Sequence, residues 1–459
     1  MTGKLGLTAT WNHDPLPALD QPGLAYLLLD IAEEGVSGES GVSPKPASPA
    51  SALLNLSLVL DTSGSMSGAK LQNLKQAVAW VIDHLSARDT IAITLFDDEV
   101  HPLVPSTKVT DANALREQVD AIREMGGTAM SKGLLVGLDE AMKGQSAEAV
   151  SRIVLLTDGQ TWGDADRCRQ LASQAGAAGI PVTALGVGAE EDWSIELLDA
   201  IASESGGISG YIAKPEEISQ AFEQTLRAMQ ATVYRNLRLT FNPAGGVSAR
   251  TAYRVSPIIS KLWPGDEAAS RISGSEGDTQ PQANGSATAL TLPLGEVESE
   301  GGQTLLFEVV VPGRKPGQYR LAHLLLEYET TDATGGRRDT ALDLVVALAE
   351  GAGKGPGNPR VMNTVEKATT FKLQTRALQA SMAGDVAAAT RNLRAAATRL
   401  LNMGETELAE AAEQEAGRLE SEGKMSAAGT KKLVFDTRKL AASELENTRA
   451  ATVRLEEEA

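Results

Sequence analysis

The sequence of 459 residues contains a single cysteine, Cys168, so no disulfide can form within the chain. It has only four histidines, and none stands at a metal-ligand spacing from a carboxylate, which argues against a histidine-based metal centre. No apolar run reaches the roughly 18 residues that a membrane-spanning helix needs. Hydrophobic residues still make up 42% of the chain, which suffices for the cores of several domains.

Basic residues are also fewer than acidic ones. The chain carries 42 Lys and Arg against 60 Asp and Glu, a formal net charge of -18 at pH 7. Such an acidic surface repels nucleic acid and anionic membranes, so neither is expected as a partner. The first twelve residues lack the charged stretch and apolar core of a signal peptide, and we therefore expect a cytoplasmic protein.

The short motifs of common enzyme sites are also missing. The sequence has no Gly-x-Ser-x-Gly elbow and no phosphate-binding P-loop. Residues 186–188, Gly-Val-Gly, lack the third glycine of a dinucleotide-binding turn and are better explained as the end of a strand. These absences favour a binding protein over an enzyme.

The most informative motif follows the apolar, strand-like run at residues 56–60. It reads Asp61-Thr-Ser63-Gly-Ser65, with one carboxylate and two hydroxyls at alternate positions on a tight turn before a helix. Hard oxygen ligands of this kind suit a small divalent cation such as Mg²⁺ or Mn²⁺. Taken alone, the motif is also compatible with an ordinary turn whose serines cap a helix.

This motif resembles the first loop of the metal-ion-dependent adhesion site in the von Willebrand factor A (vWA) family. Such a site takes ligands from two further loops, and both are present. In residues 125–130, the resemblance assigns the hydroxyl of Thr128 to the metal when a ligand is engaged. In residues 152–159, a buried type of strand ends at Asp158, which would bind the metal directly or through water. The resemblance covers residues 51–230.

The implied ligands, Asp61, Ser63, Ser65, Thr128 and Asp158, supply two negative charges and three neutral oxygens. A divalent cation is then about neutralised. Mg²⁺ keeps waters wherever the protein offers no ligand, so one position can stay open toward solvent. The Asp or Glu of a protein partner is a natural ligand for that position. Mg²⁺ or Mn²⁺ is favoured by the low ligand charge, and Ca²⁺ is the alternative.

A rim around this site is expected to include Met66, Gly127, Trp162 and Trp193. Both tryptophans should lie near the carboxyl edge of the parallel sheet, where open α/β sheets bind ligands. Exposed aromatic side chains there would anchor an interface, and packing beneath the rim is the alternative. Polar side chains that could extend the rim are Thr161, Asp164 and Asp166.

Two other groups are interpreted as structural. The acidic residues 97–99 could hold a second cation, but a solvated acidic turn explains them better. Cys168 lies in a helix-like run and is expected to be a small, half-buried side chain, with a reactive thiol as the minor alternative.

The pattern outside residues 51–230 predicts a β-sandwich. Residues 5–11 and 24–31 read as two strands, which need a larger sheet to be stable. After residue 230, strand-like runs alternate with turns rich in Gly and Pro, as in all-β sandwiches; these runs are residues 232–241, 246–256, 287–294, 303–311, 317–329 and 340–349. Residues 35–51 are expected to form a linker, and residues 264–287 a long loop.

Residues 351–459 begin with a Gly/Pro linker and continue as a helical pattern. Glycines at 384, 404 and 423 separate the helical runs, and Asp385 and Thr406 are candidate N-terminal caps. This indicates three or four antiparallel helices. They would either cover an edge of the sandwich or form an interaction or dimerisation module, through which the chain could form an oligomer.

The predicted fold is therefore an α/β, doubly wound parallel-sheet vWA domain inserted in an antiparallel β-sandwich, with a C-terminal α-helical domain. The domains are residues 1–50 (first sandwich strands and linker), 51–230 (vWA), 231–350 (β-sandwich) and 351–459 (linker and helical tail). Integrin β chains and vWA proteins of the inter-α-trypsin-inhibitor type have comparable arrangements.

We expect a non-enzymatic, metal-dependent protein-binding scaffold in a bacterial type of cytoplasm. The alternative is a regulatory subunit of an ATPase or kinase–phosphatase complex, with a structural metal and contacts through the helical tail. A metal-dependent hydrolase is a third class, but no general base is placed beside the ligands. In integrin-type relatives the last vWA helix, here residues 215–229, moves on binding, and its short junction to the sandwich would transmit such a shift.

Overall fold

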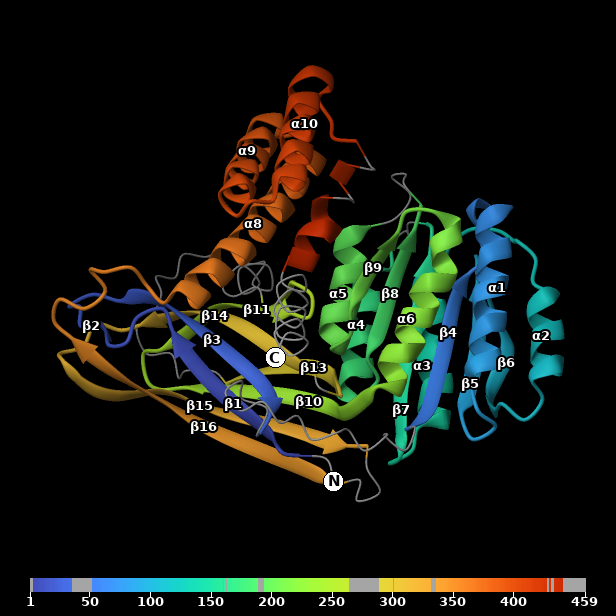
Figure 1. The fold of residues 1–459 in the computed structure, drawn as a ribbon. Coiled ribbons are helices and arrows are strands. Elements are labelled where there is room, and N and C mark those ends of the chain that lie inside the picture. The colour runs from blue at the N-terminus through green and yellow to red at the C-terminus, as the bar shows by residue number, and fades with distance from the viewer. Residues whose placement is uncertain are drawn as a thin grey trace, which may run out of the picture.

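The computed structural model describes residues 3–34, 52–159, 161, 163–188, 194–263, 289–299, 301–331, 336–426, 429–430 and 433–440. The expected linker at 35–51 and the expected loop at 264–287 lie outside these residues. The rest forms a mainly parallel α/β sheet, two antiparallel sheets and a helical C-terminal part, so the predicted fold class is confirmed (Figure 1). Among the described residues, no helix combines the length and apolarity needed to span a membrane.

The α/β part is built on a six-stranded sheet. Its strands in spatial order are β6 (Val100–Lys108), β5 (Thr90–Phe96), β4 (Leu53–Asp61), β7 (Ala149–Thr157), β8 (Val182–Val187) and β9 (Ser209–Ile212). All neighbours pair in parallel except β6, which is an antiparallel edge strand. The sequence analysis missed β6 because it carries two prolines and few apolar residues, both of which an edge strand tolerates.

Helices cover both faces of this sheet (Figure 1). One face packs against α1 (Ala69–His84), α2 (Ala112–Asp120) and α6 (Ile218–Gln230), and the other against α3 (Met130–Gly144), α4 (Ala165–Ala177) and α5 (Ile195–Ser205). In β4, Leu58 and Leu60 face the first group of helices and Val59 faces the second, as the period of two in a strand requires. Burial on both faces explains why the central strands are continuous apolar runs.

The two antiparallel sheets form a sandwich around a shared core. The first sheet contains, in order, β1 (Leu5–Trp11), β3 (Gly23–Glu33), β14 (Gly302–Val311), β11 (Ser248–Ser256) and β12 (Ser260–Trp263). The second contains β13 (Leu290–Glu298), β10 (Thr232–Pro243), β15 (Gly317–Thr330), β16 (Arg337–Ala349) and β2 (Leu16–Pro17). Since β3 precedes the α/β part and β10 follows it, that part is an insertion into the sandwich, as predicted.

Three long helices follow: α8 (Pro359–Met382), α9 (Val386–Asn402) and α10 (Thr406–Glu422). The predicted cap at Asp385 is confirmed, because its carboxylate accepts a bond from the amide of Ala388 at 2.9 Å. The predicted cap at Thr406 is wrong. Glu405 occupies the N-cap position without a side-chain bond, and Thr406 is the first helical residue.

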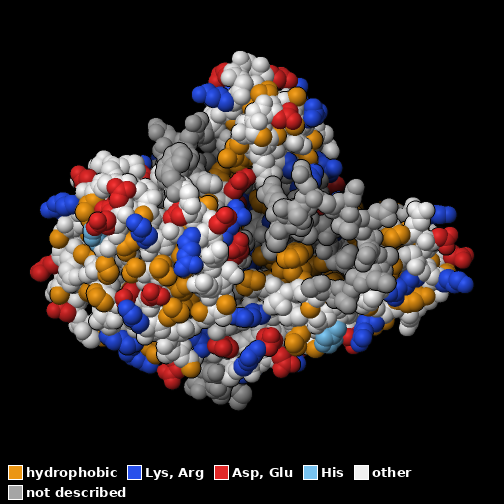
Figure 2. Space-filling view, turned by 180° about the vertical axis from the view of Figure 1, so that it is seen from behind, with side chains coloured by type: hydrophobic (Ala, Val, Ile, Leu, Met, Phe, Trp, Pro, Cys, Tyr) orange, Lys and Arg blue, Asp and Glu red, His pale blue; other side chains and the backbone are white. Residues whose placement is uncertain are grey.

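The helical part contacts both other parts of the chain. Helix α8 covers the outer face of the β3–β14–β11 sheet, where Val365 and Phe371 pack against Leu28 and Tyr253. Residues 433–440 are helical and return to the α/β part, where Phe435 joins the core beside α4 and α5. The tail therefore does more than cover a sandwich edge. Figure 2 shows it projecting from a face on which acidic and basic side chains are interspersed.

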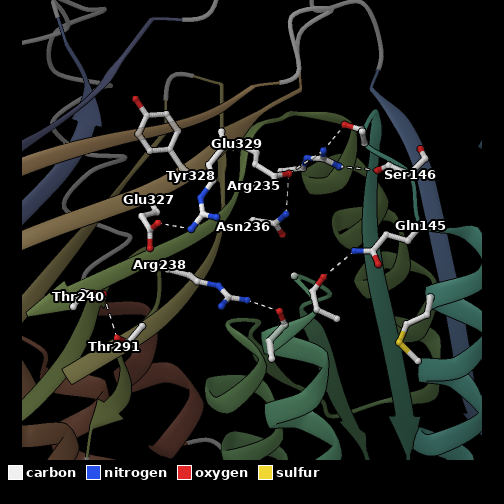
Figure 3. Close-up of a pocket in the computed structure, with 16 residues that line it drawn as sticks. Gln145, Ser146, Arg235, Asn236, Arg238, Thr240, Thr291, Glu327, Tyr328 and Glu329 are labelled. Atoms are coloured by element: carbon white, nitrogen blue, oxygen red, sulfur yellow. Dashed lines mark hydrogen bonds and ion pairs between the residues drawn. The ribbon is translucent and has the colours of Figure 1, made fainter. Parts of the chain in front are cut away.

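Arginines of β10 join the sandwich to the amino-terminal edge of the parallel sheet (Figure 3). Arg235 donates to the carbonyl of Ser146 at 3.3 Å and to those of Ala147 and Ala149, and pairs with Glu329 at 3.0 Å. Arg238 donates to the carbonyl of Gly176 at 3.0 Å, near the end of α4. These bonds add arginine donors to carbonyls at a helix end and in a loop, where the carbonyls of Ser146 and Gly176 also accept the amides of Ala149 and Gly179. Arg235 and Arg238 line a cleft of about 910 Å³ between the sandwich and the α/β part.

Candidate metal-binding site

The candidate site lies where β4 and β7 end. Asp61 is the last residue of β4, and Asp158 directly follows β7, its parallel neighbour. From β4 the chain continues to β5 on one side, whereas β7 lies on the other side, so strand order reverses between β4 and β7. Side chains at the carboxyl ends of the strands converge on a crevice at such a switch point.

The first loop is held by bonds to the Asp61 carboxylate. Its Oδ1 accepts a bond from the amide of Ser63 at 2.9 Å, and its Oδ2 accepts one from the hydroxyl of Thr157 at 2.5 Å. The chain then turns through a short 3₁₀ helix, Gly64–Met66, into α1. Asp61 is fully buried, and its carboxylate is held by its own loop and by the neighbouring strand β7.

Asp158 meets the two serines of the first loop. Its Oδ1 accepts a bond from the Ser65 hydroxyl at 2.7 Å, with the Ser63 hydroxyl 3.5 Å away. The two hydroxyl oxygens lie 3.0 Å apart. Its Oδ2 pairs with the ammonium of Lys70 at 2.5 Å. Asp158 and Ser63 are buried while Ser65 is exposed, so the group has a buried floor and a rim that is open to solvent.

Thr128, from the second loop, lies over the same crevice. A side-chain carbon placed on Gly159 would lie 2.9 Å from the Thr128 hydroxyl and 3.7 Å from Oδ2 of Asp61. The hydroxyl and the carboxylate therefore face one point, which the glycine leaves free. The structure thus brings together all five residues that the resemblance assigned to the metal.

Backbone bonds join the second loop to the first. The amide of Met125 donates to the carbonyl of Thr62 at 2.7 Å, and the amide of Gly64 donates to that of Gly126 at 3.1 Å. The Asp98 carboxylate also lies against Gly126 and Gly127, so a side chain at either glycine would have to displace it. These contacts hold the loop that carries Thr128 against the first loop.

The charges in the crevice are unbalanced. Burial raises the pKa of the Asp61 carboxyl, and the charge of Asp158 adds to the rise, whereas bonds from Thr157 and Ser63 oppose it. Among the described residues, Lys70 is the one cation that bonds to either carboxylate. A buried anion without a counter-charge favours cation binding. Carboxylate and hydroxyl oxygens are hard ligands, so the residues present fit a small divalent cation.

The expected rim is only partly as predicted. Met66 was predicted at the rim but is fully buried in the core beneath α1, because the 3₁₀ turn directs its side chain inward. Gly127 lies at the crevice but under the Asp98 side chain. Trp162 and Trp193 lie outside the described residues, so their placement stays a prediction.

The polar residues expected at the rim have a structural role. Asp164 accepts bonds from the amide of Ser131, at the start of α3, at 2.9 Å and from the hydroxyl of Thr161. It therefore joins the third loop to the helix that follows the second. Asp166 lies in the first turn of α4, where its charge favours the helix dipole.

The acidic turn at 97–99 forms no second centre. Asp97 accepts a bond from the amide of Glu99 at 2.6 Å and lies 3.6 Å from His101. Among the described residues, no three His, Cys, Asp or Glu side chains are grouped so as to hold a metal. Cys168 is fully buried, not half-buried as expected, and burial raises the pKa of its thiol to about 12.

Sequence reasoning missed two residues of the site, Thr157 and Lys70. Thr157 is a polar residue at the end of an apolar strand, directly before a predicted ligand. Lys70 is the second residue of α1, where a positive charge opposes the helix dipole. That unfavourable position marks the lysine as unusual, but it does not identify the partner.

The doubly wound sheet, with carboxylates and hydroxyls at its switch point, is similar to the fold and site of vWA domains. Residues 55–225 match the family model of the von Willebrand factor type A domain. Residues 359–443 match the model of the Sll0103-like, C-terminal alpha-helical domain. Both matches agree with the parts seen in the structure.

Individual proteins are similar to parts of this chain. The uncharacterized protein sll0103 of Synechocystis sp. is 30% identical over 291 residues, which are 63% of this chain and 64% of that protein. The human inter-alpha-trypsin inhibitor heavy chain H4 is 27% identical over 215 residues, 41% of this chain and 23% of that protein. The matches therefore span less than two thirds of these relatives.

The structure of a von Willebrand factor type A protein from Catenulispora acidiphila shares the fold. It aligns with a TM-score of 0.71 at 19% identity and covers 95% of this chain and 97% of its own. At that identity the likeness concerns the fold alone. It extends, however, over the α/β part, the sandwich and the helices together.

Proposed function

We propose that this chain is a non-enzymatic, divalent-metal-dependent protein-binding scaffold. Its vWA site would hold Mg²⁺ or Mn²⁺, with Ca²⁺ as the alternative, through Asp61, Ser63, Ser65, Thr128 and Asp158. The observation that carries the proposal is the convergence of two buried carboxylates with hydroxyls from two loops at the switch point of the sheet. vWA domains commonly act in protein–protein interaction, which supports the same reading.

The chemistry of the site indicates the kind of partner. A bound divalent cation would supply a Lewis-acidic centre for one further oxygen ligand at the open side. Ser65 and the second loop lie at the solvent-facing rim, so a ligand can approach there. The Asp or Glu side chain of a protein partner is hard and anionic and matches that position. No described His or Glu bonds to either carboxylate, which disfavours a general base beside the metal.

A pull-down from native lysate tests the proposal. Wild type and Asp61→Ala are each used as bait with Mg²⁺ and with EDTA, and Asp83→Ala serves as a matched control because Asp83 is an exposed carboxylate paired with Arg116. We expect a partner that binds wild type and Asp83→Ala only with metal, and does not bind Asp61→Ala. A partner retained in every lane would refute the metal-dependent function.

A second candidate function uses the helical tail, as a regulatory subunit of an ATPase or kinase–phosphatase complex. The tail presents Met382 and Leu401 with 69% and 56% of their surface exposed. Deleting residues 360–459 would also uncover the sheet beneath α8. The double variant Met382→Glu with Leu401→Glu tests the tail surface without removing α8. Loss of the partner, or of self-association in sedimentation, in this variant alone would favour the tail.

The cytoplasmic location is part of the same proposal. A chain with one cysteine and no internal disulfide agrees with a reducing compartment. Fractionation of the native host tests it, and recovery of the protein outside the cytoplasm would refute it.

A further inference from the structure

Lys70 occupies an unusual place for a surface lysine. It is the second residue of α1, and its side chain, 23% exposed, reaches to Asp158 instead of into solvent. Its ammonium also lies 3.6 Å from the position of a side-chain carbon on Gly188, at the end of β8. The lysine therefore spans from α1 to the ends of two strands. Since its charge opposes the dipole of its own helix, stabilising α1 does not explain the position.

Both carboxylate oxygens of Asp158 already have partners. Oδ1 accepts the Ser65 hydroxyl, and Oδ2 pairs with the Lys70 ammonium at 2.5 Å. A divalent cation bound to Asp158 directly, or through one water, must either displace the ammonium or lie within a few ångströms of it. Like charges at such a separation repel strongly in a partly buried site.

We infer that Lys70 is an internal counter-cation that competes with the divalent metal for Asp158 and makes the loaded site selective for anions. This inference rests on the proposed function. With Lys70 present, a divalent cation leaves the site one charge positive, whereas without it the two aspartates neutralise the metal. Lys70 therefore weakens binding of the metal alone and strengthens binding of a carboxylate to the loaded site. Metal and acidic partner then bind cooperatively.

Metal titration of the whole chain tests this inference. Free Mn²⁺ is measured by electron paramagnetic resonance with wild type, Lys70→Met, Lys70→Arg and Asp61→Asn, with and without acetate as the carboxylate probe. Lys143→Met is the matched control, because Lys143 pairs with Glu140 at 2.6 Å away from the site. We expect Lys70→Met to bind Mn²⁺ about tenfold more tightly than wild type, with Lys70→Arg and Lys143→Met close to wild type. Acetate should raise Mn²⁺ affinity in wild type but much less in Lys70→Met.

Thermal melting supplies a second readout that a merely structural ion pair would not give. Lys70→Met leaves two buried carboxylates without a counter-charge, so it should melt below wild type without metal and gain more than wild type when Mn²⁺ is added. A variant that melts lower and gains no more from Mn²⁺ would show that the pair only stabilises the loop.

The outcomes separate this inference from the proposed function. Equal or weaker Mn²⁺ binding by Lys70→Met, with binding still lost in Asp61→Asn, overturns the role of Lys70 and leaves the metal site intact. Absence of Mn²⁺ binding in both wild type and Lys70→Met overturns both.

Discussion

At the residue scale, the site combines atoms that the sequence motif identifies with atoms that it does not. Asp61, Ser63 and Ser65 were predictable because alternate positions on a tight turn after a buried strand face one side. Asp158, which follows a continuous apolar strand, was assigned through the resemblance to the vWA family. Lys70 was not, because its partner lies 88 residues away and most lysines near a helix start are solvated. Only the packing of α1 beside the ends of β7 and β8 brings the pair together.

The buried charge of Asp61 leads to a prediction about stability. Because burial raises the pKa of this carboxyl, the metal-free folded protein binds a proton here at a pH where the unfolded chain has released it. Its contribution to stability therefore falls as the pH rises from the ordinary carboxyl pKa through the raised one. Asp61→Asn removes this loss, so at pH 7 the metal-free variant should be more stable than wild type.

Urea unfolding across pH, with and without Mg²⁺, measures this effect. The variant should show a smaller fall in stability with rising pH than wild type, because the raised pKa of the half-buried Glu204 still contributes, and it should lose the stabilisation by Mg²⁺. The exposed-site variant Asp83→Asn should match wild type in both. Equal stabilisation of Asp61→Asn and wild type by Mg²⁺ would contradict the prediction.

At the element scale, the strands that bury both faces were predicted with nearly correct limits, whereas three of the edge strands were missed. β3 contains Leu27, Leu28 and Leu29 in a row because its inner face meets the sandwich core and its outer face meets α8. The edge strands β2, β6 and β12 carry too few buried residues to form a pattern. The return of residues 433–440 to the α/β part was also missed, because it depends on contacts between elements that are distant in sequence.

Arg438 is the centre of that return. Its side chain, 3% exposed, bonds to Asp199 of α5 at 2.6 Å and to the hydroxyl of Ser209 at 2.8 Å, and lies over the rings of Phe371 and Phe435. Its carbonyl accepts a bond from the amide of Ile259. One residue thus contacts the α/β part, the sandwich and α8.

Arg438→Ala should therefore destabilise the protein by about 2 kcal/mol or more, a value kept low because Asp199 is partly exposed. Hydrogen exchange should rise first in residues 433–440 and on α5. The stability of Arg438→Lys should lie between those of wild type and Arg438→Ala. The matched control is Arg394→Ala, whose ion pairs with Glu413 and Glu420 are exposed and should matter little. Unchanged exchange in residues 433–440 would contradict this account of the docking.

At the scale of the whole molecule, the short junction after α6 connects the α/β part, which carries the site, to the sandwich. Helix α6 ends at Gln230 and β10 begins at Thr232, so a single residue separates them. The Thr232 hydroxyl donates to the carbonyl of Ala228 at 3.0 Å and to Glu296 of β13 at 3.2 Å. Arg235, three residues after Thr232, donates to the carbonyl of Ser146 in the loop before β7. A displacement of α6 along its axis cannot be absorbed in so short a junction.

We therefore predict that binding of metal and acidic partner changes the angle between the α/β part and the sandwich. The partner recovered in the pull-down is added to wild type with Mg²⁺, and small-angle scattering is compared with the metal-free chain and with the sum of the separate components. Insertion of Gly-Gly-Ser after Ala231 should leave partner binding intact, because it lies at the opposite end of α6 from the site, but should abolish the change in shape. Identical wild-type profiles for the chain with and without metal and partner, after subtraction of the partner, would mean that α6 does not move. The arginines of β10 would then hold the two parts as one rigid body, and the site would act only as a docking point.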